Sequence, residues 1–159
     1  MKFLWAKLLP LLIGVVVLSS CSTDFKLSGI SISITDFRPK NATLLETEAA
    51  MTLRYMNENV VPIAVSGSTH KLYLNGTYVG KSVSKEAVGL PSLNTATQTV
   101  PVYMENLALV QKLLTLSEGT TAISYRLESE LFVLVGEEHD SVKIVSSGQL
   151  DLSGFAPKR

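Results

Sequence analysis

The residues of this chain that could carry chemistry are its single cysteine, Cys21, and its two histidines, His70 and His139. His139 lies in the segment GEEHD, where the carboxylates of residues 137, 138 and 140 could share a cation with an imidazole. No second histidine is close in sequence, and adjacent acidic residues mostly face solvent. We therefore interpret this segment as a solvated hairpin loop and predict no metal site.

His70 lies in the segment SGSTHKLYL, close to serines of the kind that a Ser-His hydrolase needs. Such a nucleophile commonly sits in a GxSxG elbow between a strand and a helix, and the sequence has no such elbow. The sequence also lacks a glycine-rich phosphate loop, a CxxC pair and an HExxH helix. We therefore interpret His70 as a structural residue of a strand, expect no cofactor, and predict that the protein is not an enzyme.

Cys21 follows a segment with the layout of a secretory signal peptide, residues 1–20. Lys2 and Lys7 precede an apolar run of about eleven residues, whereas a membrane-spanning helix needs about twenty. The tetrapeptide LSSC that ends at Cys21 resembles the bacterial lipobox, which implies S-diacylglycerol and N-acyl (palmitate-type) modification of this cysteine. Cys21 would then anchor the protein to a membrane. The alternative is an ordinary secretory signal with an incidental cysteine.

The remaining sequence predicts one domain. We expect a signal peptide at 1–20, a lipidated tether at 21–27, a folded domain at 28–154 and a tail at 155–159. Ser22 follows the cysteine in place of an aspartate, which among Gram-negative lipoproteins favours the outer membrane, facing the periplasm. The segment after Cys21 has no basic run, so nucleic acid is not an expected partner.

Most of the predicted domain has the period-two pattern of half-buried strands. ISISITDF, from Ile30, and AMTLRYMN, from Ala50, alternate apolar and polar residues, and so does SYRLESELFVLV. Asn75 and Gly76 form the dipeptide preferred in two-residue type I′ hairpin turns. Pro101 in TQTVPVYM cannot donate to a ladder, which predicts an edge or a bulge there.

One segment departs from this pattern. In NLALVQKLLTLSEG, leucines and a valine recur at three- and four-residue spacing over 107–116, with Asn106 as the predicted cap and Gly119 past the end. The sequence therefore predicts a mostly β fold: an antiparallel β-sandwich of about seven strands, immunoglobulin- or fibronectin-like, with one short α-helix.

Three short segments in this order resemble the late embryogenesis abundant type 2 family, also called the water stress and hypersensitive response (WHy) domain. They are LRYMNENVVPIAVSG from Leu53, LYLNGTYVG from Leu72, and VPV from Val100. Glu58 replaces the proline usual between the two asparagines of the first motif, although Asn57 and Asn59 can still close a turn. The resemblance spans almost the whole domain.

The resemblance implies a sandwich without catalytic apparatus and a role in desiccation and other stress. We therefore expect a membrane-anchored domain that shields or binds envelope proteins. Two alternatives stay open: a lipid-binding or lipid-carrier module of the envelope, and an accessory subunit of an envelope complex. Inward alternation does not separate them, because it looks the same whether the interior is solid or hollow.

Overall fold

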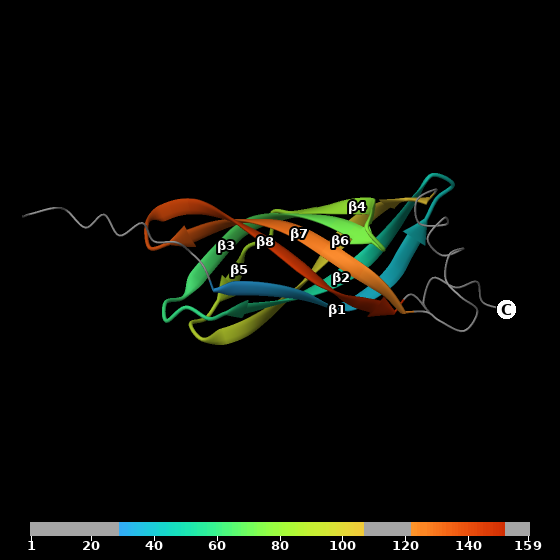
Figure 1. The fold of residues 1–159 in the computed structure, drawn as a ribbon. Coiled ribbons are helices and arrows are strands. Elements are labelled where there is room, and N and C mark those ends of the chain that lie inside the picture. Colours follow the sequence, from blue (N-terminus) through green and yellow to red (C-terminus); the bar gives the residue numbers. More distant parts are fainter. Residues whose placement is uncertain (1–28, 107–121, 152–159) are drawn as a thin grey trace, which may run out of the picture.

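The computed structural model describes residues 29–106 and 122–151, and these residues form eight strands (Figure 1). In chain order the strands are β1 (Ile30–Ala42), β2 (Glu46–Asn57), β3 (Ile63–Leu74), β4 (Thr77–Ser84), β5 (Val88–Leu90), β6 (Asn94–Glu105), β7 (Ala122–Val135) and β8 (Glu138–Asp151). All pairings between them are antiparallel, which confirms the predicted mostly β class. The helix predicted over 107–116 lies outside the described residues. Within those residues, no helix is long and apolar enough to cross a membrane.

The strands form one continuous sheet in the order β1-β2-β6-β4-β3-β7-β8, with the short β5 paired to β3. The sheet curls until its two end strands, β1 and β8, lie next to each other (Figure 1). No ladder between described residues joins these two strands. The predicted sandwich of separate sheets is therefore replaced by a curled half-barrel.

The two halves of the half-barrel are joined by a very short ladder. β4 and β6 pair only through Gly80 with Met104 and Lys81 with Tyr103. A Cβ built on Gly80 would collide with the Tyr103 carbonyl oxygen and lie 2.9 Å from the Met104 Cα, so only glycine lets the backbones approach here. This short ladder is what joins β1-β2-β6 to β4-β3-β7-β8 in one continuous sheet.

The interior follows the period-two pattern of the sequence. Met51, Leu53 and Tyr55 are fully buried, as the alternation of β2 predicts. In β7, Leu127 and Leu131 point inward. These side chains belong to one continuous cluster with the inward residues of the other strands, so the core fills the half-barrel.

The predicted turn is confirmed. Asn75 and Gly76 have φ values of 45° and 77°, as a type I′ turn requires. The Asn75 backbone N–H donates to the Ser124 carbonyl at 2.9 Å, which ties the β3–β4 hairpin to β7. Pro101 pairs with Ala50 on β2, and the opposite side of β6 carries a described ladder only at residues 103–104. At Pro101, β6 thus has a described ladder on one side only, as an edge strand does, and its register with β2 has no bulge there.

Candidate functional site

Of the three residues singled out by sequence, the structure describes His70 and His139. Cys21 lies outside the described residues. His139 is exposed at the start of β8, where its Cα partner is Leu134 on β7. No group of three His, Cys, Asp or Glu side chains in the described part of the chain could hold a metal ion.

His70 is the centre of a polar cluster inside the half-barrel. Its ring Nδ1 lies 2.8 Å from the Ser129 hydroxyl, and its Nε2 lies 2.9 Å from the Ser68 hydroxyl. The side chain is only 1% exposed, and the two serines are 3–4% exposed. Both ring nitrogens are thus satisfied by neutral hydroxyl groups, and a protein interior accepts such a network because its members are paired.

The strand register explains this cluster. His70 on β3 has Ser82 on β4 and Ser129 on β7 as its Cα partners. All three side chains point inward, so they form a polar row across three strands. The Ser82 hydroxyl is buried and has no hydrogen-bond partner among the described residues.

Burial controls the electrostatics of the cluster. It lowers the pKa of His70 to about 4, because desolvation penalises the imidazolium. Nearby, burial raises the pKa of Tyr55 to about 12, and a hydrogen bond with the Ser68 side chain opposes part of that rise. Both groups are therefore neutral at pH 7. Two serine hydroxyls beside an imidazole resemble parts of a nucleophile–base pair, yet the reactive atoms are buried from solvent.

A second polar chain begins at Tyr55 and leads outward. Its hydroxyl donates to Gln98 Oε1 at 3.2 Å, and Gln98 Nε2 donates to the Glu86 carbonyl at 3.0 Å and to the Ser84 hydroxyl at 3.4 Å. Gln98 is half-buried on β6. Hydrogen bonds thus connect the Tyr55 hydroxyl in the interior to the Glu86 carbonyl and the Ser84 hydroxyl, and the alternating apolar pattern of the sequence does not predict this connection.

The sequence contains a signal for this cluster. His70 has the same parity along β3 as Leu72 and Leu74, and Ser129 has the same parity along β7 as Leu127 and Leu131. A polar residue at an inward position of a strand predicts a buried partner on a neighbouring strand. The interpretation of His70 as a structural strand residue is consistent with this geometry. Its pairing with Ser129 could not be predicted without the register of β3 and β7.

The asparagine motif forms a turn around the buried Asn57 side chain, as the sequence predicts for Asn57 and Asn59. Asn57 Oδ1 accepts a hydrogen bond from the Asn59 backbone N–H at 3.0 Å. Asn57 Nδ2 donates to the carbonyls of Val61, Leu90 and Pro91 at 3.0–3.2 Å. Because Asn57 is fully buried, this one side chain ties the end of β2 to β5 and to the β2–β3 loop.

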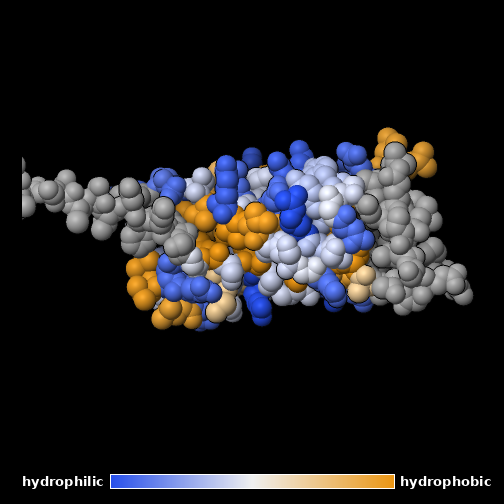
Figure 2. All heavy atoms as spheres, in the orientation of Figure 1, coloured by the Kyte–Doolittle hydropathy of each residue, from blue (hydrophilic) through white to orange (hydrophobic). Residues whose placement is uncertain are grey.

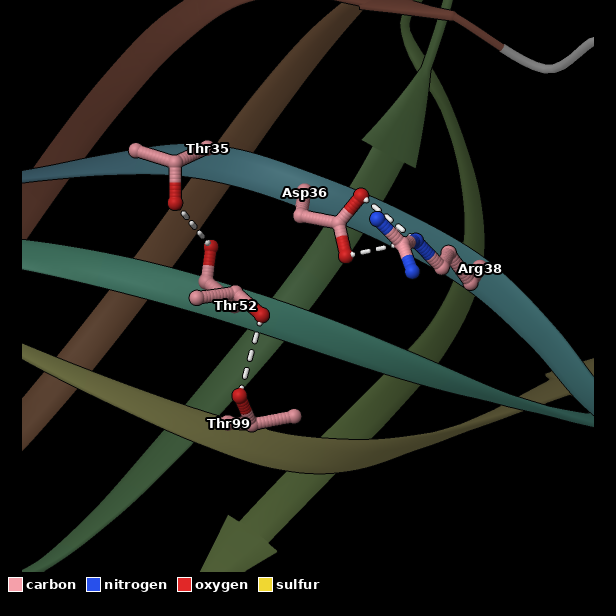
Figure 3. Close-up of polar contacts among 5 residues, drawn as sticks. All are labelled: Thr35, Asp36, Arg38, Thr52 and Thr99. Atoms are coloured by element: carbon pink, nitrogen blue, oxygen red, sulfur yellow. Dashed lines mark hydrogen bonds and ion pairs between the residues drawn. The ribbon is translucent and has the colours of Figure 1, made fainter.

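The outer face of β1, β2 and β6 carries short hydroxyl side chains (Figure 3). Thr52 on β2 shares a 2.9 Å hydrogen bond with Thr99 on β6, and Thr35 on β1 donates to the Thr52 carbonyl at 3.3 Å. On β1, Asp36 and Arg38 form an exposed ion pair at 2.9 Å. An exposed pair of this kind contributes little to stability. These described side chains bond to one another or to the backbone, and they do not form a catalytic or ligand-binding cluster.

Three grooves mark the described surface. One, of about 480 Å³, lies between β1 and β8 and is lined by 34–39 and 149–151. A second, of about 500 Å³, is apolar and is lined by residues near the start of β3, the end of β5 and the end of β7. A third, of about 310 Å³, involves Lys71, Glu128, Glu130 and Lys143. Hydrophobic surface gathers toward the end that holds the β7–β8 hairpin (Figure 2).

Asn106, the predicted helix cap, takes part in the β1–β2 hairpin. It accepts a hydrogen bond from the Thr47 hydroxyl at 2.6 Å and donates to the Thr43 carbonyl at 2.7 Å. Its backbone N–H also donates to the Leu45 carbonyl. The side chain thus fixes the end of β6 against this hairpin.

Three solved structures are similar to this chain, and the first of them supports the fold. A solution structure of a protein from Arabidopsis thaliana has a TM-score of 0.53 and 20% identity, over 80% of this chain and 87% of that one. A crystal structure of a protein from Archaeoglobus fulgidus covers 80% and 98% at 18% identity, with a TM-score of 0.46. A solution structure described as a late embryogenesis abundant protein covers 79% and 72% at 13% identity, with a TM-score of 0.41.

Comparison of sequences identifies the family. No curated protein matches the chain. The model of the late embryogenesis abundant type 2 family matches residues 52–144, which is more than half of the chain. The matched segment runs from β2 into β8 and includes the buried Asn57 turn and the His70 row. The chain belongs to the late embryogenesis abundant type 2 family.

Proposed function

We propose that this protein is a lipid-anchored, non-catalytic domain of the bacterial envelope, which protects other envelope proteins under water stress by binding them. Membership of the late embryogenesis abundant family supports the stress-related role. The anchor rests on the LSSC tetrapeptide at 18–21. The partners are therefore a membrane, through Cys21, and proteins exposed in the envelope.

The closed geometry of the His70 cluster carries the non-catalytic part of the proposal. Catalysis by a histidine requires a nucleophile or substrate within hydrogen-bond reach of the ring. Both His70 nitrogens already contact serine hydroxyls, and the cluster is buried. A pKa of about 4 also makes this imidazole a weak base at neutral pH. The cluster therefore serves the fold.

A protection assay tests the binding role. An unrelated soluble enzyme is dried and rehydrated, or heated, with the full-length protein at increasing molar ratio, and its aggregation is followed by light scattering. We expect less aggregation than with albumin at equal mass. Equal scattering with the two proteins at every ratio would refute the protective role.

Fatty-acid labelling tests the anchor. Cells that produce the full chain are grown with labelled palmitate, and the protein is isolated from membranes. Label should enter the protein with Cys21 and be absent from Cys21→Ala, because the thiol is the proposed acceptor. Equal labelling and equal membrane retention of the two forms would rule out the lipoprotein assignment.

The apolar groove near the β7–β8 hairpin favours a second candidate, a lipid-binding module. Ile63, Leu90 and Leu134 line this groove together with Pro62 and Pro91. Apolar grooves with few polar groups suit acyl chains. Mass spectrometry of the protein purified without detergent would detect a stoichiometric lipid if this candidate is right, and no lipid if the groove is empty.

A further inference from the structure

The outer edge of β8 is a long and regular strand edge. β8 pairs with β7 from Glu138 to Asp151 without a register shift, and no ladder of described residues runs along its other side. Edge strands are usually protected from pairing by prolines, bulges or charged side chains such as lysine. β1 has Pro39 and two register shifts, whereas β8 has no proline and no register shift, and Lys143 is the one charge near its middle. We call the segment Ser141–Ser147 the β8 edge.

The inward side chains of the β8 edge are apolar and only partly covered. Val142 and Ile144 are half-buried and pack against the core, as does Ile34 on β1. Lys143 is the only charged residue of the β8 edge, and it is exposed, 3.8 Å from Glu130. The buried Ser146 hydroxyl has no hydrogen-bond partner among the described residues. This edge therefore presents backbone groups and an apolar row at alternate positions.

The seam between β1 and β8 is bridged near the end of β8. The last residues of β8 face the 34–39 segment of β1, and the Tyr125 hydroxyl accepts a hydrogen bond from the Ile34 backbone N–H at 3.2 Å. A Cβ on Gly148 would lie 2.7 Å from the Tyr125 ring, so glycine lets this ring pass under β8. Toward the β7–β8 hairpin the two strands diverge (Figure 1). The β8 edge lies in the diverging part.

We propose that the β8 edge binds an extended, unfolded segment of a partner protein as an added strand, with alternate apolar side chains of that segment covering Val142 and Ile144. Strand addition to an open edge is an established mode of peptide recognition. A folded second copy would bring its own β7 beside its β8, whereas an unfolded segment brings no flanking strand. This inference rests on the proposed function and names the site through which it would act.

Peptides with selective N-methylation test the inference. The full-length protein is titrated with a peptide of about eight residues in which valine and threonine alternate, a length typical of strands. Two further forms carry N-methyl groups at either the odd or the even positions. Backbone N–H groups of a strand point alternately to its two sides, so one form loses its donors to β8.

The parent peptide should bind and should slow amide hydrogen exchange at 141–147. At least one N-methylated form should bind about tenfold or more weakly, which corresponds to about 1.4 kcal/mol. The inference is overturned if the parent does not bind, or if both methylated forms bind as the parent does. Sedimentation of the protein without and with the peptide is a further check. A dimer that dissociates when the peptide binds would assign the edge to a second copy and overturn the inference.

Two lysine substitutions on β8 form a matched pair. Val142→Lys places a charge in the seam, whereas Val145→Lys places one on the outer face, where Val145 is 63% exposed. Only Val142→Lys should weaken peptide binding, by about tenfold or more. Equal binding by two folded variants contradicts the inference. If circular dichroism shows that Val142→Lys is unfolded, the N-methylated peptides decide.

The two proposals fail separately. Protection of an enzyme from aggregation, together with equal binding of all three peptides, would leave the proposed function standing and remove the β8 edge as its site. Methylation-sensitive peptide binding without protection would retain the site and remove the protective role. Protection that is lost in Val142→Lys and kept in Val145→Lys would support both.

Discussion

Protonation of His70 should destabilise the folded domain as the pH falls. The ring is buried, and its two nitrogens contact the hydroxyls of Ser68 and Ser129, so the folded state holds a neutral imidazole. Its pKa is lowered from 6.5 to about 4 in the folded state. That difference, at about 1.36 kcal/mol per pH unit, corresponds to about 3 kcal/mol.

The direction follows from proton linkage. Because the folded-state pKa lies below the value of 6.5 for the free side chain, the unfolded state binds the proton more readily. The stability that the neutral His70 contributes is fully present above about pH 6.5 and is lost as the pH falls toward about 4. Carboxylates also titrate near the lower end of this range, so a variant is needed to isolate His70.

Denaturant unfolding of three proteins measures the effect. The wild type, His70→Gln and His139→Gln are unfolded in urea at a series of pH values from about 7 to about 4. Glutamine keeps polar ends near the serines and cannot become an imidazolium. Over this range the wild type should lose about 3 kcal/mol more unfolding free energy than His70→Gln. His139→Gln is the control, since its side chain is exposed, and should follow the wild type. Parallel curves for the wild type and His70→Gln would refute the reasoning.

Three further substitutions test the fold through chemical unfolding. Gly80→Ala should cost about 2 kcal/mol or more, because the new Cβ meets the β6 backbone near Met104, whereas Gly89→Ala, which meets nothing within 4 Å, should be tolerated. Asn57→Ala should cost about 1–3 kcal/mol, because it leaves the buried Leu90 carbonyl and the partly buried Val61 and Pro91 carbonyls without their donor, and a loss below about 0.5 kcal/mol would contradict the role of the turn. Gly76→Val should cost about 1–3 kcal/mol through backbone strain at φ 77°, with Gly76→Asn much milder; equal losses would argue against a type I′ turn.

Alternation and turn chemistry were sufficient to predict the strands. Met51, Leu53 and Tyr55 are buried as their period requires, and Asn75 with Gly76 forms the expected turn. These features are local, because the side-chain period and the φ preference of each residue depend on its own segment. The asparagine turn was predictable for the same reason, since Asn57 and Asn59 are near neighbours in sequence.

The assembly of the strands was not predictable in this way. A period-two pattern states which side chains point inward and leaves open which edges meet. The join at Gly80 and Met104 depends on a close backbone approach between strands that are distant in sequence. The contact of His70 with Ser129 likewise depends on the register of β3 and β7. A single sheet and a two-sheet sandwich therefore look alike at the level of the sequence.

Survival of envelope enzymes through drying tests the central claim most directly. Cells that lack the protein are supplied with the wild type, with His139→Ala, or with a form in which an ordinary secretory signal replaces residues 1–21. The recovered activity of a native envelope enzyme is measured after drying and rehydration, with protein levels matched. The account predicts protection by the wild type and by His139→Ala, and loss of protection in the unanchored form. Equal protection by the unanchored form would contradict the anchored role, and loss in His139→Ala would contradict a non-catalytic domain.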